Sequence, residues 1–319
     1  MDLYQESLKN NEGNIKPAIF MFKANVERFR IHYQTKNLIP GNYPHLGVTV
    51  REGIHVLYRI EGDSQWLNVD AFTSRNSPIS VNMKYLAEEN QIYEILIYGP
   101  VLSEVELLKI ELDDNAIFET MNTTLSQDLL ILGGIHSLGI GCTASGVMFS
   151  NILARKYNKR FQNVSFNDKN HLKLIYDYIQ NHDLEKFSTI ILELDYIRQD
   201  DEIFDEYSRK VIRKLKSKCD NLICWYAIPH SETDRHSKLS NFTNKFSKRN
   251  VYVCDLSFIY DDNHSEMCTH SKNYINDTGN IMIYKALFKK IEEIKQAPKS
   301  NNFNDKIRGL TNGIFNFNR

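Results

Sequence analysis

A glycine-rich segment, residues 133–146, carries the side chains best suited to nucleophilic chemistry. Ser137 stands next to His136, and Cys142 follows in the same segment. A serine becomes a nucleophile when a base such as histidine removes its proton, and a cysteine does so when a helix N-terminus lowers its pKa. Each also has a structural interpretation, as a turn serine and a packed cysteine, and we favour that interpretation for both.

A second polar segment, residues 261–270, follows the last predicted strand. It carries His264, Cys268 and His270 behind two aspartates, and these residue types can bind zinc. Their spacing matches no zinc motif, so we predict no metal and keep His264 and His270 as candidate catalytic residues. Gly139-Ile-Gly141 lacks the third glycine of a dinucleotide fingerprint, and no Walker loop is present, so we predict no cofactor.

The elements that position these segments alternate between strand and helix. The predicted strands are 128–132, 161–166, 189–194, 221–228 and 251–256, and the predicted helices are 147–157, 170–180, 200–218 and 279–294. This alternation indicates an α/β domain over residues 128–296 with a doubly wound, five-stranded parallel sheet. Sites in such sheets lie beyond the carboxyl ends of the strands, where segments 133–146 and 257–278 begin. We predict a polar loop over residues 229–238.

The first half of the chain shows the two-residue alternation of β-strands instead. Ile54, Val56, Tyr58 and Ile60 alternate with other residues after a turn signal at 51–53. Short strands at near-regular spacing predict an all-β sandwich or jelly roll with no long helix. The predicted divisions of the chain are an N-terminal extension over 1–16, the sandwich over 17–112, a polar linker over 113–127, the α/β domain over 128–296 and a flexible tail over 297–319.

The order of several motifs resembles the SGNH/GDSL hydrolases, in the branch with an N-terminal β-sandwich. The segment Gly133-Gly-Ile-His-Ser-Leu-Gly139 is similar to the family's Gly-[Asp/Thr]-Ser-Ile-Thr-x-Gly, and Gly146 and Leu153-Ala-Arg155 follow at the family's spacing. The segment Ser271-Lys-Asn-Tyr-Ile-Asn-Asp-Thr-Gly279 is similar to Asp-x-x-His-Pro-Asn-Asp-x-Gly. The resemblance spans residues 20–295 and implies an SGNH, flavodoxin-like α/β fold.

The resemblance also implies a Ser/His/Asp triad, and this sequence departs from it at every mapped position. Ile135 stands at the nucleophile, Ser271 at the aspartate and Tyr274 at the histidine, while Ser165 replaces the oxyanion glycine. An alkyl side chain cannot attack a carbonyl. Tyrosine, with an ordinary pKa of about 10, is a poor base at neutral pH. Ordinary serine-esterase chemistry is therefore not expected.

Other parts of the family pattern map less directly. A different alignment makes His270 the surviving catalytic histidine, but Met267 then takes the aspartate position and the Asn276-Asp-Thr-Gly279 match is lost, so we prefer the gapless alignment. The family's third-block asparagine maps loosely onto Arg198 or Gln199. The residues that do match, Asn276, Asp277 and Gly279, are expected to be structural.

The composition of the chain argues against some classes of binding partner. The chain has 319 residues, with 39 basic and 40 acidic side chains and a net charge of −1, which provides no overall field to attract nucleic acid or a membrane surface. Five cysteines without a CxxC pair favour reduced thiols. The first 16 residues do not resemble a signal peptide, and no 18-residue apolar run occurs, so we expect a cytoplasmic protein.

Two functional hypotheses stand close together. The first is a non-catalytic protein with a degenerate triad that binds a small molecule, an acyl-peptide, a carbohydrate or a protein partner. The second is an esterase, deacylase or acyltransferase on the same scaffold that uses Cys142, Ser137 or His270. An apolar, filled cleft around Ile135 would favour the first hypothesis. Convergent polar side chains would favour the second.

Overall fold

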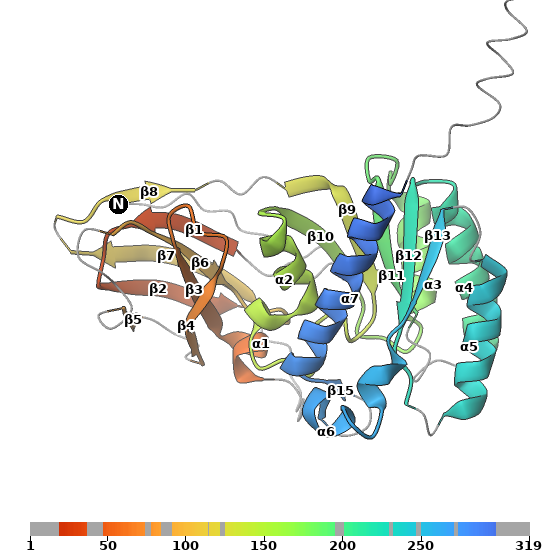
Figure 1. The fold of residues 1–319 in the computed structure, drawn as a ribbon. Helices are drawn as coiled ribbons and strands as arrows, with labels where there is room; N and C mark the ends of the chain where they lie inside the picture. The colour runs from red at the N-terminus through yellow and green to blue at the C-terminus, as the bar shows by residue number, and fades with distance from the viewer. Residues whose placement is uncertain are drawn as a thin grey trace, which may run out of the picture.

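The computed structural model describes residues 19–36, 47–73, 78–83, 91–113, 115–121, 125–194, 201–229, 232–246, 250–270 and 274–297 (Figure 1). The predicted N-terminal extension, and the predicted tail after residue 297, lie outside this part of the chain. Within it, two antiparallel sheets occupy one half of the molecule and a parallel sheet with helices occupies the other. No helix in the described ranges is long and apolar enough to cross a membrane.

The N-terminal half consists of sheet A, in the order β4-β3-β6-β1-β8, and sheet B, in the order β5-β2-β7. Their strands are β1 (Ile19–Ala24), β2 (Arg28–Lys36), β3 (Ile54–Ile60), β4 (Leu67–Phe72), β5 (Ile79–Asn82), β6 (Tyr93–Tyr98), β7 (Glu104–Leu112) and β8 (Phe118–Thr120). Alternate residues of β2, Phe29, Ile31 and Tyr33, share one buried core with Phe22 of β1. The two sheets therefore enclose a common apolar core, as expected for a β-sandwich. The jelly-roll connection stays a prediction.

Two elements of this half differ from the expectation. A five-residue helix, α1 (Val48–Glu52), lies where the sequence indicates only a turn at 51–53. The segment is too short for helical periodicity to appear, and Val50 is buried against the other half of the molecule. The segment predicted as a polar linker contains β8, which extends sheet A by pairing with β1. Its Phe118 ring lies 5.3 Å from that of Phe22, so one aromatic residue adds this polar stretch to the core.

The C-terminal half has the predicted doubly wound architecture. Sheet C is parallel throughout, in the order β10-β9-β11-β12-β13. Its strands are β9 (Leu125–Gly133), β10 (Arg160–Ser165), β11 (Thr189–Glu193), β12 (Asn221–Tyr226) and β13 (Val251–Asp255). Ile190, Ile191 and Leu192 are fully buried in succession, because helices cover both faces of the central strands.

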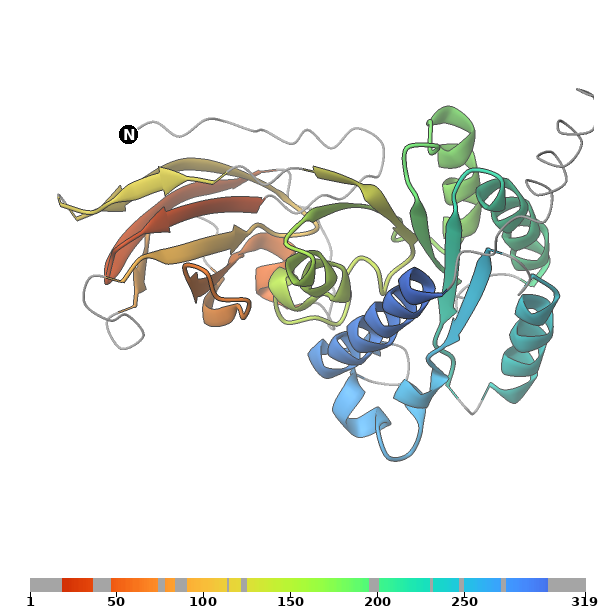
Figure 2. The same ribbon diagram turned by 45° about the horizontal axis from the view of Figure 1, so that its top comes forward.

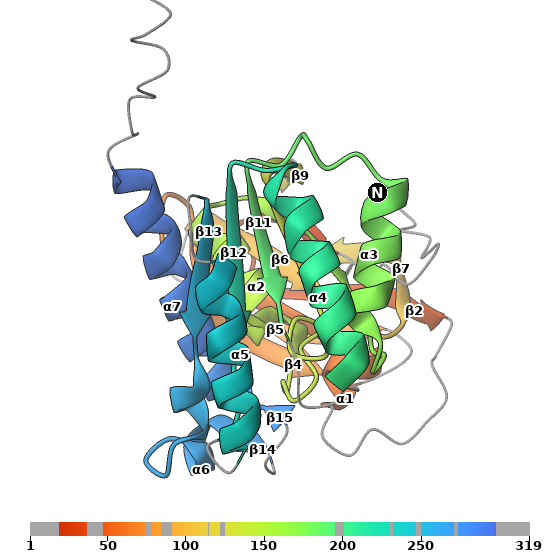
Figure 3. The same ribbon diagram turned by 90° about the vertical axis from the view of Figure 1, so that its right-hand side faces the viewer.

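Helices form two layers around sheet C. The helices α2 (Phe149–Lys156) and α7 (Asp277–Gln296) lie between sheet C and the sandwich (Figures 1 and 2). The helices α3 (His171–Asn181), α4 (Asp201–Lys216) and α5 (Thr233–Phe246) cover the opposite face (Figure 3). The loop prediction over 229–238 was wrong from residue 233 onward, where α5 begins. Only a few residues of this polar helix, such as Leu239 and Phe242, are buried, so its sequence shows little periodicity.

Candidate functional site

A buried carboxylate organises the turn that follows β9. Glu193, at the end of β11, is fully buried and accepts hydrogen bonds from three backbone N–H groups of the turn. The N···O distances are 3.0 Å from Gly134, 3.2 Å from His136 and 2.8 Å from Ser137. Several N–H groups that converge on one point form an anion-binding nest, and here the chain's own carboxylate occupies it. These three donors are therefore committed and do not face a substrate oxyanion.

Ile135, the predicted nucleophile position, is 3% exposed and lies at the joint between the two halves of the molecule. The joint cluster combines residues of the sandwich half with residues of the glycine-rich segment. Its buried members are Val50, Val101, Leu102, Ile135, Leu138, Ile140, Cys142 and Met148. Tyr274, the predicted histidine position, packs against the same cluster. The space around Ile135 is thus apolar and filled.

The relocated-nucleophile candidates beside Ile135 are also buried. Ser137 is 0% exposed and His136 is 2% exposed. The Ser137 hydroxyl and both ring nitrogens of His136 have no hydrogen-bond partner among the described residues. Ser137 and His136 are adjacent in the sequence, but no hydrogen bond joins their side chains in the way that an activated pair requires.

Cys142 lies in the joint cluster with its side chain fully buried. Burial raises the pKa of this thiol well above its usual range, and nearby Asp277 acts in the same direction. Its backbone carbonyl accepts a hydrogen bond from Gly47 N–H of the sandwich half at 3.1 Å. A reactive cysteine needs a lowered pKa and access to solvent, so these surroundings disfavour a nucleophilic role.

Ser165, the predicted oxyanion position, belongs to a small network under the same turn. Its hydroxyl donates to Asn163 Oδ1 at 2.6 Å, and Asn163 Nδ2 donates to the Ser137 carbonyl at 2.8 Å. Both side chains lie at the end of β10 and are buried. They hold the turn from β10, whereas Glu193 accepts hydrogen bonds from it at the end of β11, on the other side of β9. The Ser165 hydroxyl is already bonded within the protein.

The histidine-bearing segment after β13 folds into short elements. They are η2 (Ser257–Tyr260), α6 (Ser265–Cys268), β14 (Thr269–His270) and β15 (Tyr274–Ile275). His264 precedes α6, with its ring 5.9 Å from that of Phe258, whereas His270 is exposed and pairs with Tyr274 in the β14–β15 ladder. No three His, Cys, Asp or Glu side chains of the described ranges are grouped to hold a metal ion.

Some predicted positions lie outside the described residues. Among them are Ser271, the predicted aspartate position, and Arg198 and Gln199, the candidates for the third block. The choice between His270 and Tyr274 as the family histidine also stays a prediction. His270 and Tyr274 pair with each other in the β14–β15 ladder, so both alignments put the family's histidine position in this ladder.

The matching Asn276, Asp277 and Gly279 have structural contacts. The Asn276 side chain caps α7 by accepting from Gly279 N–H at 3.1 Å. Asp277 accepts two hydrogen bonds from Thr143, from its backbone N–H at 2.8 Å and from its hydroxyl at 2.5 Å. These bonds hold the glycine-rich segment against the start of α7. Gly141 completes the contact, because its φ of +107° favours glycine and a Cβ there would strike the Ile275 carbonyl.

His55 of β3 connects the sandwich to the same region. Its Nδ1 accepts from Gly146 N–H at 3.1 Å, and its Nε2 bonds to Asn68 Oδ1 at 2.6 Å. This pattern requires the neutral imidazole with the proton on Nε2. Burial lowers the pKa of His55, and Arg155 lowers it further, while the bond to Asn68 opposes both. The Arg155 guanidinium also bonds to Tyr98 Oη at 3.2 Å, so several polar contacts fix the joint.

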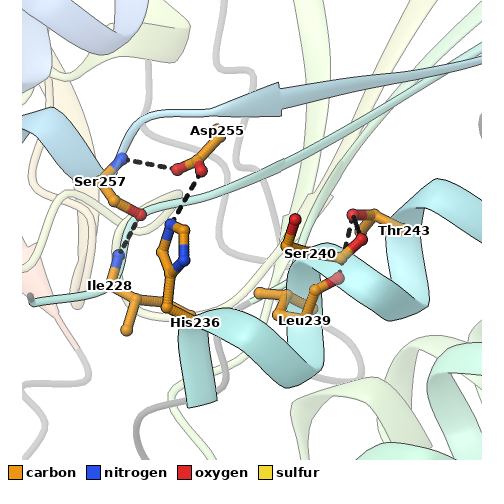
Figure 4. A network of polar contacts seen from close by, with 7 residues as sticks. All are labelled: Ile228, His236, Leu239, Ser240, Thr243, Asp255 and Ser257. Carbon is orange, nitrogen blue, oxygen red and sulfur yellow. Dashed lines mark hydrogen bonds and ion pairs between the residues drawn. The ribbon is translucent and has the colours of Figure 1, made fainter. Parts of the chain in front are cut away.

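A separate polar network lies where β12 and β13 end (Figure 4). His236 of α5 bonds through Nε2 to Asp255 Oδ2 at 3.0 Å, and Asp255 Oδ1 accepts from Ser257 N–H at 3.0 Å. Burial would raise the pKa of Asp255, but the bonds from Ser257 and His236 outweigh it and lower this pKa. Ser257 Oγ also accepts from Ile228 N–H at 3.1 Å. The network joins α5 to the sheet edge.

Glu193, His55 and the His236–Asp255 pair were not predicted as site residues from the sequence. For Glu193 a signal was present, since a carboxylate ends an otherwise apolar strand at the edge of the sheet where sites form. His55 gave no such signal, because its partner Gly146 lies in the other half of the chain. His236 was assigned to a loop and not to the helix that directs it toward Asp255.

Comparison with known proteins adds information about the fold. No protein-family model matches the chain, and no curated protein matches its sequence. Solved structures do match. A GDSL-like lipase from Bacteroides ovatus ATCC 8483 has a TM-score of 0.68 and 15% identity, over 87% of this chain and 84% of that one.

Two further solved structures match over similar lengths. The salicylyl-acyltransferase SsfX3 of a tetracycline biosynthetic pathway has a TM-score of 0.52 and 12% identity, over 88% of this chain and 83% of its own. A family two carbohydrate esterase from Clostridium thermocellum, in complex with cellohexaose, has a TM-score of 0.55 and 8% identity, over 88% and 93%. The chain therefore has the SGNH/GDSL hydrolase fold, as its motifs predicted.

Proposed function

We propose that this chain is a non-catalytic member of the SGNH-like fold that binds a small-molecule ligand. The observation that carries the proposal is the position of Ile135. This side chain stands where the motif alignment expects the nucleophile, and it is buried with Val50, Val101 and Leu102 of the sandwich half. A substrate carbonyl at this position would meet alkyl groups in place of a hydroxyl.

The surrounding groups support the same conclusion. Tyr274 packs on the joint cluster, and the Ser165 hydroxyl is bonded to Asn163. Three N–H groups of the turn are held by Glu193. A hydrolase needs an activated nucleophile and free donors aimed at the developing oxyanion. The described residues around Ile135 provide neither, while the contacts that build the fold are kept.

Turnover assays test the proposal. Purified protein is incubated with nitrophenyl acetate and with panels of acyl-sugars and acyl-peptides, beside the Ser137→Ala and Cys142→Ala variants. We expect the rates of all three proteins to equal the buffer rate. Hydrolysis by the wild type that either variant abolishes, with its melting temperature unchanged, would show that the chain is an enzyme.

One observation favours the enzyme hypothesis as the second candidate. The Ser137 hydroxyl and the His136 ring are adjacent in sequence, buried, and unbonded among the described residues. A rearrangement of the turn that exposes them would create a serine–histidine pair for acyl transfer or hydrolysis. The His270→Ala variant extends the assay to the third candidate of this hypothesis.

We propose two chemical classes of ligand from the names of the matching structures. Two of the matching structures are named for acyl transfer and for a cellohexaose complex, so acyl-bearing and carbohydrate ligands are the first classes to test. A protein partner and a cytoplasmic location also remain proposals. Binding of cellohexaose, measured by calorimetry, tests the carbohydrate class directly.

A further inference from the structure

Exposed apolar side chains lie beyond the end of β13, on η2, on the short helix α6 and near the start of α7 (Figure 1). Met267 of α6 is 56% exposed, the highest value among the large apolar side chains of the described ranges. Phe258 of η2 and Ile281 of α7 are exposed as well. Single exposed apolar residues need no explanation, but a group of them on neighbouring elements is typical of an interaction surface.

Phe258 and Met267 are connected through His264. The ring of Phe258 lies 5.9 Å from that of His264, and the two rings meet edge to face at 82°. The His264 carbonyl accepts a hydrogen bond from Met267 N–H at 3.0 Å. The helix α6 also contacts η2 directly, so Phe258 and Met267 stand on adjacent elements.

Met267 and Ile281 are connected through the start of α7. The Met267 carbonyl accepts from Asn276 Nδ2 at 2.8 Å, and Asn276 is the residue that caps α7. The sulfur atoms of Cys268 and Met282 are 3.4 Å apart. Since these two residues directly follow Met267 and Ile281 in the sequence, the backbone that carries the exposed side chains is fixed on both sides of the contact.

The charged side chains of this region are acidic. Residues 250–270 and 274–284 contain five carboxylates and no Lys or Arg, although the whole chain has 39 basic and 40 acidic residues. Asp262 follows η2 and Glu266 directly precedes Met267, and both are exposed. Charge complementarity across an interface selects the partner, so these carboxylates favour Lys and Arg and disfavour an anionic membrane.

We propose that Phe258, Met267 and Ile281, with Asp262 and Glu266 beside them, form a docking surface for a cationic amphipathic segment of a partner protein. The apolar face of this segment covers the three apolar side chains, and its Lys or Arg side chains pair with the two carboxylates. The flexible thioether of Met267 adapts to the shape of the segment, while the fixed backbone limits the ordering that binding requires. The inference goes beyond the proposed ligand-binding role and does not depend on it.

Synthetic peptides test the inference on the full chain. The probe is a helix of about 18 residues, or five turns, built from Leu and Lys with every Leu on one face. One matched peptide has Glu in place of each Lys, which reverses the charge. A second has the same Leu and Lys residues in an order that forms no apolar face. Fluorescence anisotropy of the labelled peptides measures the dissociation constants at low and high salt.

We expect the Leu/Lys helix to bind saturably, with one peptide per chain, and to bind less tightly as salt screens the charges. Both matched peptides should bind at least about tenfold more weakly. Met267→Ser should weaken binding of the helix by about tenfold, and Glu266→Lys should do the same at low salt. Ile117→Ser and Asp63→Lys, at exposed positions of the sandwich half, are the matched controls and should bind as wild type.

The inference is overturned if the wild type does not bind the Leu/Lys helix, or if either matched peptide binds as tightly. Normal binding by Met267→Ser, with an unchanged melting temperature, also overturns it. Two further outcomes would identify a different occupant and have the same consequence. They are self-association of the free chain that Met267→Ser abolishes, measured by sedimentation velocity, and binding of the chain to phosphatidylcholine vesicles.

Discussion

The carboxylate of Glu193 accepts a hydrogen bond from Ser137 N–H at 2.8 Å, from a position with no exposure to solvent. The bond joins the end of β11 to the turn that follows β9. Two more N–H groups of the turn, from Gly134 and His136, bond to the same carboxylate. The turn to which the motif alignment assigns the nucleophile is therefore fixed by a buried side chain of the neighbouring strand.

Replacing Glu193 by Gln should destabilise the protein by about 2–4 kcal/mol, because the amide N–H₂ cannot accept and at least one buried N–H loses its partner. Urea unfolding measures the change in the free energy of unfolding. The control is Glu185→Gln, which removes an exposed ion pair with Lys218 and should cost no more than about 0.5 kcal/mol. Equal stabilities for the two variants would contradict the role assigned to Glu193.

Replacing Ile135 by Ser should lower stability by about 2–4 kcal/mol, since it leaves a cavity and a buried hydroxyl in the joint cluster. Ile281→Ser, at a more exposed position on α7, is the matched control and should have a small effect. We also expect Ile135→Ser to gain no esterase activity, because the preferred motif alignment puts Tyr274, a poor base, at the histidine position. Turnover of nitrophenyl acetate by this variant would show that the rest of a catalytic site is intact.

The stability of the protein should fall at acid pH because His55, which lies at the joint between the two halves, becomes protonated. Burial lowers its pKa in the folded state below the usual value of 6.5, so the unfolded chain takes up a proton first as the pH falls. The stabilising contribution of His55 is full above pH 6.5 and is lost as the pH falls through the folded-state pKa. Urea unfolding at pH 7.5 and pH 5.0 measures the loss.

The His55→Asn variant isolates this effect. Asparagine retains an uncharged acceptor for Gly146 N–H but does not titrate, so the difference in stability between the two pH values should be smaller than in wild type. Three residues act on His55 electrostatically, namely Asp70, Asp277 and Arg155, and all are present in both proteins. Any effect of their own titration on stability is therefore the same in both and cancels in the comparison. An identical pH dependence in the two proteins would exclude His55 as the sensitive group.

Alanine substitutions at two glycines with positive φ distinguish the cost of backbone strain from the cost of a steric clash. Gly141→Ala adds a methyl group that collides with the Ile275 carbonyl, whereas Gly62→Ala adds it in open space at a φ of +91°. Gly62→Ala should cost about 1 kcal/mol from strain alone, and Gly141→Ala at least about 2 kcal/mol more. Thermal melts compare the two variants. Equal melting temperatures would mean that the segment moves away from α7 at little cost.

The sequence predicted most of the architecture because apolar periodicity determined it. The strands Thr189–Glu193 and Asn221–Tyr226 of sheet C appear as apolar runs, and the alternation over Ile54–Ile60, now β3, contributed to the prediction of the sandwich. Helix α5 was missed because few of its side chains are buried. Helix α1 was missed because its stability depends on contacts between Val50 and the distant glycine-rich segment, which no local pattern shows.

For the candidate site, the motif order singled out the glycine-rich segment but could not show its contacts. Ile135 and Cys142 belong to the joint cluster and Ser137 lies in the same glycine-rich segment, but whether each side chain is buried, bonded or free depends on segments that are distant in the sequence. Glu193 is separated from the turn by an entire strand–helix unit, so only the folded chain shows that the two meet.

The most direct test of a non-catalytic role is the intact mass of the protein after prolonged incubation with a fluorophosphonate probe, which modifies activated serines. With Ile135 buried and Ser137 enclosed and unactivated, we expect the mass to stay unchanged, while a serine hydrolase in the same tube is labelled completely. Addition of one probe molecule at a single serine, Ser137 above all, would contradict the proposal and identify the chain as an enzyme.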